Sequence, residues 1–136
     1  MTAYLLDSHI FIWLQTDRSR LKASLVAEIA STANEAYLSI VSVIELFDKF
    51  SKRGGTGLDH VLARGAEALE DDLDEAGLKI LPIEVKHAAV LRALPVHHRD
   101  PFDRLLIAQA ISEGLTMVSG DRAFERYDGL RLVKCQ

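Results

Sequence analysis

Apolar residues recur along the chain with two different periods, which indicates strands alternating with helices. Short apolar runs bounded by turn-forming residues are typical of buried strands, and they lie at 3–6, 36–39, 78–83, 116–119 and 130–134. Segments in which apolar residues return every three or four positions are typical of amphipathic helices, and they lie at 8–15, 22–33, 41–52, 58–76, 84–94 and 101–113, with a short one at 122–127. This alternation predicts an α/β fold: a three-layer α/β/α sandwich around a central, mostly parallel sheet of about five strands.

The chain length and composition fit one globular domain. With 136 residues, 49% of them hydrophobic, residues 1–136 form a single domain with a sizeable core. The glycine-rich stretch "KRGGTG" (52–57) is interpreted as a loop within this domain. No apolar run approaches the ~20 residues that span a bilayer, and the N-terminus lacks the features of a signal peptide. We therefore expect a cytoplasmic protein without a membrane partner.

Charge and cysteine content exclude some classes of site. The single cysteine, Cys135, excludes an intrachain disulfide and a thiolate zinc cluster. The net charge of −4 argues against the broad cationic surface of a typical DNA-binding module. If four acids were metal ligands, 16 basic residues would face 16 acidic ones, so a nucleic-acid substrate stays open. The acidic segment 69–77 is interpreted as a solvated helix face that Gly77 ends.

The stretch "HHRDPFDRLLIAQA" (97–110) contains two aspartates at the start of a predicted helix. Asp100 followed by Pro101 is typical of an N-cap and first helical residue. Asp103 shares the i, i+3, i+4 stripe with Leu106 and Ile107, so it begins the face that enters the core. We therefore interpret Asp100 as the cap and Asp103 as the candidate for chemistry.

Four acids lie where predicted strands and helices meet. Asp7 ends the first strand, Asp121 follows the fourth, Glu45 lies early in the helix after the second, and Asp103 opens the helix before the fourth. In open α/β sheets, ligands bind outside the carboxyl ends of the strands, where these residues would meet. Taken singly, each has a capping alternative: Asp7 and Asp121 as N-caps, and Ser42 with Glu45 as a capping box.

Convergence of these carboxylates would require protonation or a cation. Two carboxylates about 4 Å apart repel by roughly 4 kcal/mol at an effective dielectric constant near 20. Because only oxygen ligands are available, the expected cation is Mg²⁺ or Mn²⁺. Such an ion can activate water and neutralise charge on a phosphate oxygen, which predicts phosphodiester or phosphomonoester hydrolysis.

The segments "LLDSHIFIWL", "YLSIVSVIEL" and "HHRDPFDRLLIAQAISEGLTMVSGDRAFERY" resemble the PIN-domain ribonucleases, and within them the VapC-type toxins of bacterial toxin–antitoxin pairs. The resemblance implies a PIN-like sandwich and a metal-dependent endoribonuclease that uses Mg²⁺ or Mn²⁺. It places the family's invariant acids on Asp7, Glu45 and Asp103, with the more variable fourth acid on Asp121. All four are therefore the expected catalytic residues and metal ligands.

The resemblance also implies partners. They are an RNA substrate, a second copy of the chain in a homodimer, and a small antitoxin whose C-terminal segment lies in an apolar groove and reaches the acidic site. Two positions depart from the family pattern: Ser8 stands where threonine is frequent, and Ser119 with Gly120 stands where threonine and another residue are usual. Both departures keep a hydroxyl, so Ser8 and Ser119 are candidates for a hydrogen bond to metal-bound water, with capping as the alternative.

Several neighbours of these acids have both a functional and an ordinary interpretation. Candidate phosphate contacts, for which surface ion pairing is the alternative, are Lys49, Arg99, Arg104 and Arg122. His9 could contact substrate or solvent. The adjacent His97 and His98 are not expected to bind zinc, because neighbours in a loop point apart.

The first helix is apolar nearly all round, so Trp13, with Phe47 and Phe50, forms either core or a partner surface.

Two other functional classes stay open. A magnesium-dependent phosphomonoesterase would share the carboxylate site, but the common aspartyl-phosphate type needs a second Asp two residues after the nucleophile, where this chain has His9. A non-catalytic α/β interaction module would use the acids only as caps. Metal titration separates these classes, because caps need no Mg²⁺ and a convergent site gains stability with it.

Overall fold

The computed structural model, which describes residues 1–97 and 100–135, contains a five-stranded parallel sheet. Its strands, in chain order, are β1 (Ala3–Leu6), β2 (Glu35–Ser39), β3 (Leu78–Leu81), β4 (Thr116–Ser119) and β5 (Arg131–Lys134). They are arranged in the order β3-β2-β1-β4-β5, and all four pairings are parallel. The predicted α/β class is confirmed, with a sheet that is wholly parallel.

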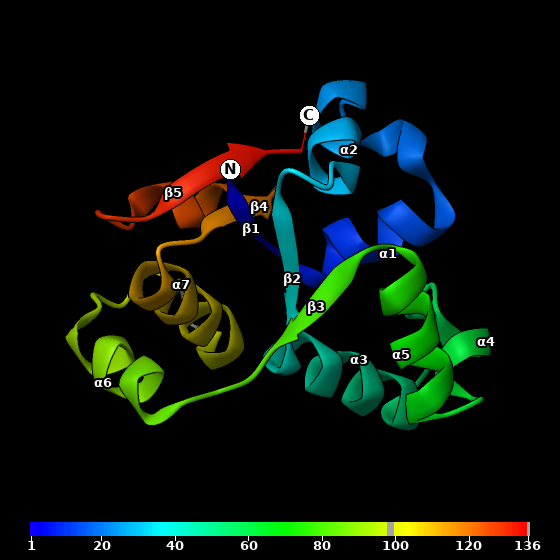
Figure 1. The fold of residues 1–136 in the computed structure, drawn as a ribbon. Helices are drawn as coiled ribbons and strands as arrows, with labels where there is room; N and C mark the ends of the chain where they lie inside the picture. The colour runs from blue at the N-terminus through cyan, green and yellow to red at the C-terminus, as the bar shows by residue number, and fades with distance from the viewer. Residues whose placement is uncertain (98–99, 136) are drawn as a thin grey trace.

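Helices cover both faces of the sheet and form a three-layer sandwich (Figure 1). They are α1 (Ser8–Thr16), α2 (Ala23–Ala30), α3 (Ile40–Lys52), α4 (Asp59–Leu62), α5 (Ala66–Glu75), α6 (Val85–Ala93) and α7 (Pro101–Glu113), with 3₁₀ turns η1 (Arg18–Arg20) and η2 (Arg122–Arg126). In the described part of the chain, none of the helices combines the length and apolar character that crossing a bilayer requires.

Alternation along β1 divides the buried side chains between two cores. Tyr4 and Leu6 pack with the helices α1 to α5, whereas Leu5 packs with α7 and η2 on the opposite face. Because successive residues of a strand point to opposite faces, one central strand supplies both cores. Burial on both faces accounts for the nearly continuous apolar character of this strand.

Three predicted boundaries are wrong, and two of them have a clear local cause. The segment 58–76 contains two helices, α4 and α5, because Gly65 between them has a φ of +96° that ends any continuous helix. The strand predicted at 78–83 ends at Leu81, directly before Pro82, which has no N–H for the ladder. The helix predicted at 22–33 ends at Ala30.

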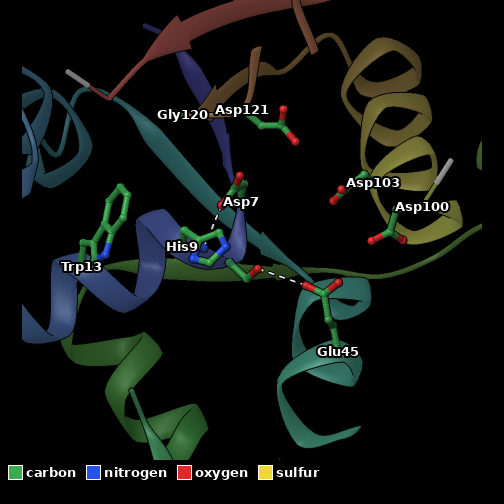
Figure 2. A pocket seen from close by; sticks show the side chains of 9 residues that line it. Asp7, His9, Trp13, Glu45, Asp100, Asp103, Gly120 and Asp121 are labelled. Atoms are coloured by element: carbon green, nitrogen blue, oxygen red, sulfur yellow. Dashed lines mark hydrogen bonds between the residues drawn. The ribbon is translucent and has the colours of Figure 1, made fainter. Parts of the chain in front are cut away.

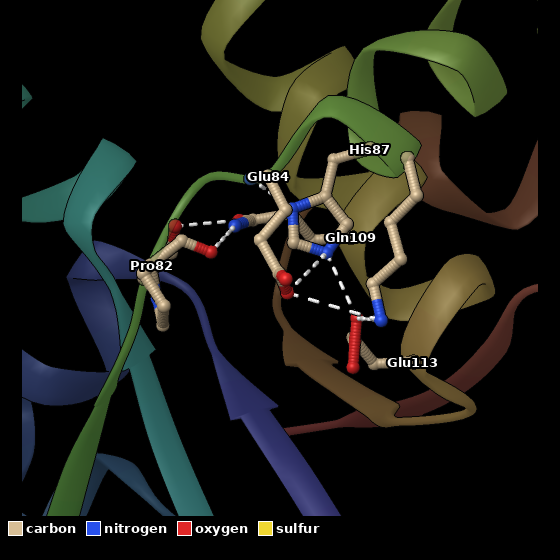
Figure 3. Close-up of polar contacts among 7 residues, drawn as sticks. Pro82, Glu84, His87, Gln109 and Glu113 are labelled. Atoms are coloured by element: carbon tan, nitrogen blue, oxygen red, sulfur yellow. Dashed lines mark hydrogen bonds and ion pairs between the residues drawn. The ribbon is translucent and has the colours of Figure 1, made fainter.

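A buried polar network joins α7 to the ends of two strands. Gln109 is fully buried; its amide oxygen accepts a hydrogen bond from the Ser39 hydroxyl at 2.5 Å, and its amide nitrogen donates to the Pro82 carbonyl at 3.2 Å (Figure 3). The same Ser39 hydroxyl accepts from the N–H of Val41 and so caps α3. One side chain therefore fixes α7 relative to the start of α3, the helix that carries Glu45.

Candidate functional site

The sheet order places a topological switch point beside β1. From β1 the chain continues outward through β2 and β3, whereas β4 and β5 lie on the other side of β1. Ligands of open α/β sheets bind at such points, outside the carboxyl ends of the strands. Asp7 directly follows β1, and Asp121 comes two residues after β4, so the two flank this point.

All four acids predicted from the sequence line one cavity of about 440 Å³ at this edge (Figure 2). Asp7 comes from the end of β1, Glu45 from α3, Asp103 from the first turn of α7, and Asp121 from the turn before η2. The structure also adds a fifth carboxylate, Asp100, to the same cavity. Segments more than 100 residues apart in sequence thus bring a group of carboxyl oxygens together.

A chain of hydrogen bonds through Ser119 connects two of these acids. The Ser119 hydroxyl donates to Asp7 Oδ2 at 2.6 Å and accepts from the backbone N–H of Asp121 at 3.0 Å. The other Asp7 oxygen accepts from the N–H of His9 at 2.7 Å. Because Asp7 and Ser119 are 8% and 1% exposed, their bond is shielded from water and holds the Asp7 carboxylate in one orientation.

Glu45 is oriented by the second hydroxyl that the sequence singled out. The Ser8 hydroxyl donates to Glu45 Oε1 at 3.1 Å, and Figure 2 shows this bond spanning from α1 to α3. Burial raises the pKa of Glu45 above its ordinary value, and the negative charges of Asp100 and Asp7 raise it further against the opposing bond from Ser8. The site therefore disfavours the ionised form of Glu45 in the absence of a cation.

An aspartate of this site can cap a helix and line the cavity at the same time. Asp7, Asp100 and Asp121 are the N-caps of α1, α7 and η2, each through one oxygen, Oδ1. The backbone N–H holds one oxygen of each carboxylate while the residue still lines the cavity. The prediction that Asp100 is the N-cap of α7 is confirmed, and Asp103 lines the cavity as expected, but Asp100 lines it too.

The capping box of Ser42 and Glu45, the alternative to a site role for Glu45, does not form. Helix α3 begins at Ile40, with Ser39 as its N-cap, so Glu45 lies in its second turn. Ser42 is buried within the helix, and its hydroxyl has no hydrogen-bond partner among the described residues. Glu45 is thus left to point into the cavity.

The basic residues considered as phosphate contacts lie in different environments. Lys49 lines a cleft that adjoins the carboxylate cavity, and Arg122 lines a smaller pocket beside Asp121. Arg104 instead points at α6, where its guanidinium donates to the carbonyls of Leu91 and Leu94 at 3.5 and 3.3 Å. Its guanidinium therefore caps the C-terminus of α6, and Arg104 is not among the residues that line the carboxylate cavity.

Three candidates lie at or near the boundary of the described residues. His98 and Arg99 fall outside them. The backbone N–H of His97 donates to the hydroxyl of Tyr127 at 3.2 Å, and the two rings meet edge to face with centroids 5.1 Å apart. His97 thus packs against the segment after η2.

The aromatic residues of the predicted partner surface lie in different places. Trp13 lines the carboxylate cavity together with His9, and the guanidinium of Arg20 lies over its ring, 5.2 Å from the centroid. Phe47 lines a separate apolar cavity between α3, α5 and β3, and Phe50 packs against the core. Of the two alternatives that the sequence leaves open, core packing holds for Phe47 and Phe50, and the three aromatic residues do not line one common cavity.

A second group of potential metal ligands lies at the opposite end of α7. One ligand atom each from Glu84, His87 and Glu113 lies within 4.8 Å of the others (Figure 3). His87 Nδ1 accepts from the backbone N–H of Glu84 at 2.9 Å, so neutral His87 carries its proton on Nε2, which faces Glu113 at 2.9 Å. Lys86 also pairs with Glu113 at 2.7 Å. These bonds favour a polar connection between α6 and α7 over a metal site.

A family model for the PIN domain matches residues 4–130. The chain belongs to the PIN domain family. No curated protein sequence matches this PIN domain.

Solved structures share the fold of this PIN domain over nearly its whole length. VapBC2 from Rickettsia felis, bound to a DNA fragment from its promoter, superposes with a TM-score of 0.74 at 19% identity, covering 99% of this chain and 100% of the other. VapBC from Salmonella typhimurium, also DNA-bound, gives 0.61 at 21% identity with full coverage of both chains. VapBC-5 from Mycobacterium tuberculosis, a member of the VapBC toxin–antitoxin family, gives 0.61 at 19% identity, covering 100% and 99%. At these identities the likeness shows a common fold.

Proposed function

We propose that this PIN domain is a metal-dependent endoribonuclease of the VapC type, the toxin of a toxin–antitoxin pair. The observation that carries the proposal is the convergence of Asp7, Glu45, Asp103 and Asp121 in one cavity at the switch point of the sheet. Proteins with PIN domains are generally nucleases, which supports hydrolysis of nucleic acid. The structural neighbours are VapBC proteins, which supports the toxin assignment.

The residues of the cavity fit a hard divalent cation. Their donor atoms are carboxylate oxygens, the ligands that Mg²⁺ and Mn²⁺ prefer. Asp7, Glu45 and Asp103 would hold the ion, and Asp121 would complete its shell or contact a second one. When bound, Mg²⁺ or Mn²⁺ lowers the pKa of water and neutralises charge on a phosphate oxygen.

The protein contributes orientation to this chemistry. Asp7 is held at both oxygens, by the His9 N–H and the Ser119 hydroxyl, so its free lone pairs have a fixed direction. Glu45 is held by Ser8 in the same way at one oxygen. Both hydroxyls reach the carboxylates directly, a more immediate role than the bond to metal-bound water considered from the sequence.

The proposal extends to protein partners. The antitoxin is supported by the structural neighbours, which include a toxin–antitoxin complex from Klebsiella pneumoniae. A homodimer is supported by large apolar side chains that stay exposed on α3, on β3, in the loop after β3 and at the start of α6, namely Ile44, Ile80, Ile83 and Val85. Sedimentation of the purified chain tests the dimer: a monomeric mass at micromolar concentration would contradict it. A cytoplasmic location remains a prediction from the sequence.

The catalytic assignment is tested by two amide substitutions. Asp7→Asn and Asp103→Asn should abolish Mg²⁺-dependent cleavage of a single-stranded RNA while the circular dichroism spectrum is unchanged. Asp72→Asn, on α5, is the matched control and should cleave at the wild-type rate. A parallel single-stranded DNA of the same sequence should remain intact.

A thermal readout tests the metal independently of cleavage. At Mn²⁺ concentrations ten times the dissociation constant, binding stabilises the native state by about 1.4 kcal/mol. We expect this gain in the wild type and the control, and its absence in Asp7→Asn. Retained cleavage by Asp7→Asn, in a preparation shown to be free of contaminating nuclease, would refute the assignment.

A further inference from the structure

A second cleft, of about 520 Å³, adjoins the carboxylate cavity and has a different chemical character. The two share Ser8, His9 and Glu45, so they form one continuous depression. Beyond the shared residues, the second cleft is lined by the basic side chains of Lys49, Lys52 and Arg53, together with Asp48, Thr56 and Phe102. We call it the basic cleft.

The basic side chains follow Glu45 along one side of α3. Lys49 comes one helical turn after Glu45, and Arg53, the C-cap, comes one turn later. Residues four apart share a helix face, and four residues rise about 6 Å. The face that begins with a carboxylate at the site therefore continues as a row of positive charges leading away from it.

Cations near a helix C-terminus are favoured by the helix dipole alone, so the other features of the cleft decide whether it binds a ligand. Lys52 is paired with Asp48 at 3.0 Å, whereas Lys49 and Arg53 form no ion pair with another described residue. The charge of Lys49 also lowers the pKa of the nearby Asp59, as a minor contribution beside the hydrogen bonds of that carboxylate. Within the described part of the chain, neither Lys49 nor Arg53 is held in a close ion pair that an anion would have to break.

The loop at 52–57, which brings Thr56 to the basic cleft, is tied to Asp59 and to α1. The Asp59 carboxylate accepts hydrogen bonds from the N–H of Gly55 at 2.7 Å, from the N–H of Thr56 at 3.0 Å and from the Thr56 hydroxyl at 2.5 Å. A Cβ on Gly57 would lie 2.9 Å from a methyl carbon of Ile12, so the loop also packs closely against α1. The loop at 52–57 is thus fixed in place before any ligand arrives.

Phe102 adds an aromatic surface to the basic cleft and lies next in sequence to Asp103 of the carboxylate cavity. Its ring is 38% exposed, and its backbone N–H donates to Asp100 Oδ1 at 2.9 Å. The ring is therefore positioned beside the carboxylates by the same capping bond that begins α7. Proteins that bind single strands combine a positive groove with aromatic side chains on which bases stack.

We propose that the basic cleft binds the single-stranded RNA segment next to the cleaved bond, with Lys49 and Arg53 contacting its phosphates and Phe102 stacking on a base. This inference rests on the proposed ribonuclease function and gives the strand a direction, along α3 from Glu45 toward Arg53. Because phosphate contacts carry no sequence information, the cleft selects single-stranded structure rather than a particular sequence.

The test measures binding without cleavage. A fluorescein-labelled 12-nucleotide RNA of mixed sequence is titrated with protein in EDTA, and its anisotropy is followed at several salt concentrations. The double variant Lys49→Ala/Arg53→Ala should raise the Kd about tenfold or more. It should also reduce the slope of log Kd against log salt by about 1.4, which is about 0.7 for each lost phosphate contact.

Matched variants separate the cleft from general charge. Lys22→Ala/Arg64→Ala removes the same charge from residues that line neither cavity and should leave the Kd within twofold of the wild type. Phe102→Leu should weaken binding about fivefold, and Phe102→Trp should restore it. Thermal unfolding of each variant verifies that it is folded.

The inference is overturned if the two double variants bind RNA equally. It is also overturned if polyglutamate displaces the RNA at a similar concentration of charge, because an acidic protein segment would then be the better occupant of the basic cleft. Failure of the ribonuclease proposal has a separate signature: the wild type would not cleave RNA with Mg²⁺, whatever the binding assay in EDTA shows.

Discussion

Replacing Ser119 by alanine removes one hydroxyl that serves both Asp7 and Asp121. The variant loses the 2.6 Å bond to the Asp7 carboxylate and the acceptor for the N–H of Asp121. A hydrogen bond to a charged group contributes about 1.5–3 kcal/mol, and a donor left without an acceptor adds to the cost. Because Ser119 is 1% exposed, water does not readily replace the hydroxyl. We expect the free energy of unfolding to fall by about 2 kcal/mol.

This loss is large enough to measure by thermal unfolding. For a chain of 136 residues, the entropy of unfolding is about 290 cal/mol/K, so about 2 kcal/mol lowers the Tm by about 7 °C. Urea unfolding should show a lower midpoint with an unchanged m-value. Mn²⁺ affinity should fall as well, because the Asp7 carboxylate loses one of the two bonds that orient it.

Two further variants test the role assigned to the hydrogen bond between Ser119 and Asp7. Ser8→Ala removes a longer bond, 3.1 Å, from a half-buried pair, so it should cost only about 0.5–1 kcal/mol. Ser119→Thr keeps the hydroxyl and should retain most of the Mn²⁺ affinity. A Tm for Ser119→Ala within 2 °C of the wild type, or a larger loss from Ser8→Ala, would show that the bond to Asp7 does not hold the site together.

Two further predictions concern the polar connections of α7. Lys86 and His87 hold the pKa of Glu113 below its ordinary 4.5, so their stabilisation is present above that pH and is lost as the pH falls through the lowered pKa. Glu113→Gln should therefore cost about 1 kcal/mol at pH 7 and progressively less as the pH falls below 4.5, and a cost in urea unfolding that does not decrease with falling pH would contradict this. Gln109→Leu leaves the Ser39 hydroxyl proton without its acceptor and the Pro82 carbonyl without its side-chain donor, and should cost about 2–3 kcal/mol in urea unfolding; a loss below 0.5 kcal/mol would contradict the role assigned to this network.

The strands and the candidate site were more predictable from the sequence than the helix boundaries. Buried parallel strands carry short continuous apolar runs, which do not depend on distant partners to be recognised. By contrast, apolar periodicity runs through 58–76 without a visible interruption, and only the positive φ of Gly65 separates α4 from α5. The order of the strands is set by tertiary packing, which no local pattern records.

The roles of the acidic residues are hard to predict from the sequence for a different reason. From the sequence, helix capping and a role in the site are alternatives for each acid. In the structure Asp7 combines them, because its Oδ1 caps α1 while its carboxylate lines the cavity. The position of Asp100 as the N-cap of α7 is therefore no argument against its place in the cavity. The bond between Ser39 and Gln109 had no sequence signal, because the two residues are 70 positions apart and each is unremarkable locally.

The position of β1 at the centre of the sheet has a consequence for synthesis. β1 is made first, yet one of its two edges stays unpaired until β4, more than 100 residues later, has been synthesised. The bond from Ser119 to Asp7 closes across 112 positions, so a nascent chain holds Asp7 and Glu45 but lacks the rest of the carboxylate group. Domains fold as units during translation, and an open strand edge is exposed to wrong pairing. Under the proposed function, the incomplete chain thus lacks a complete catalytic site while its open strand edge favours aggregation, and both conditions end when β4 docks.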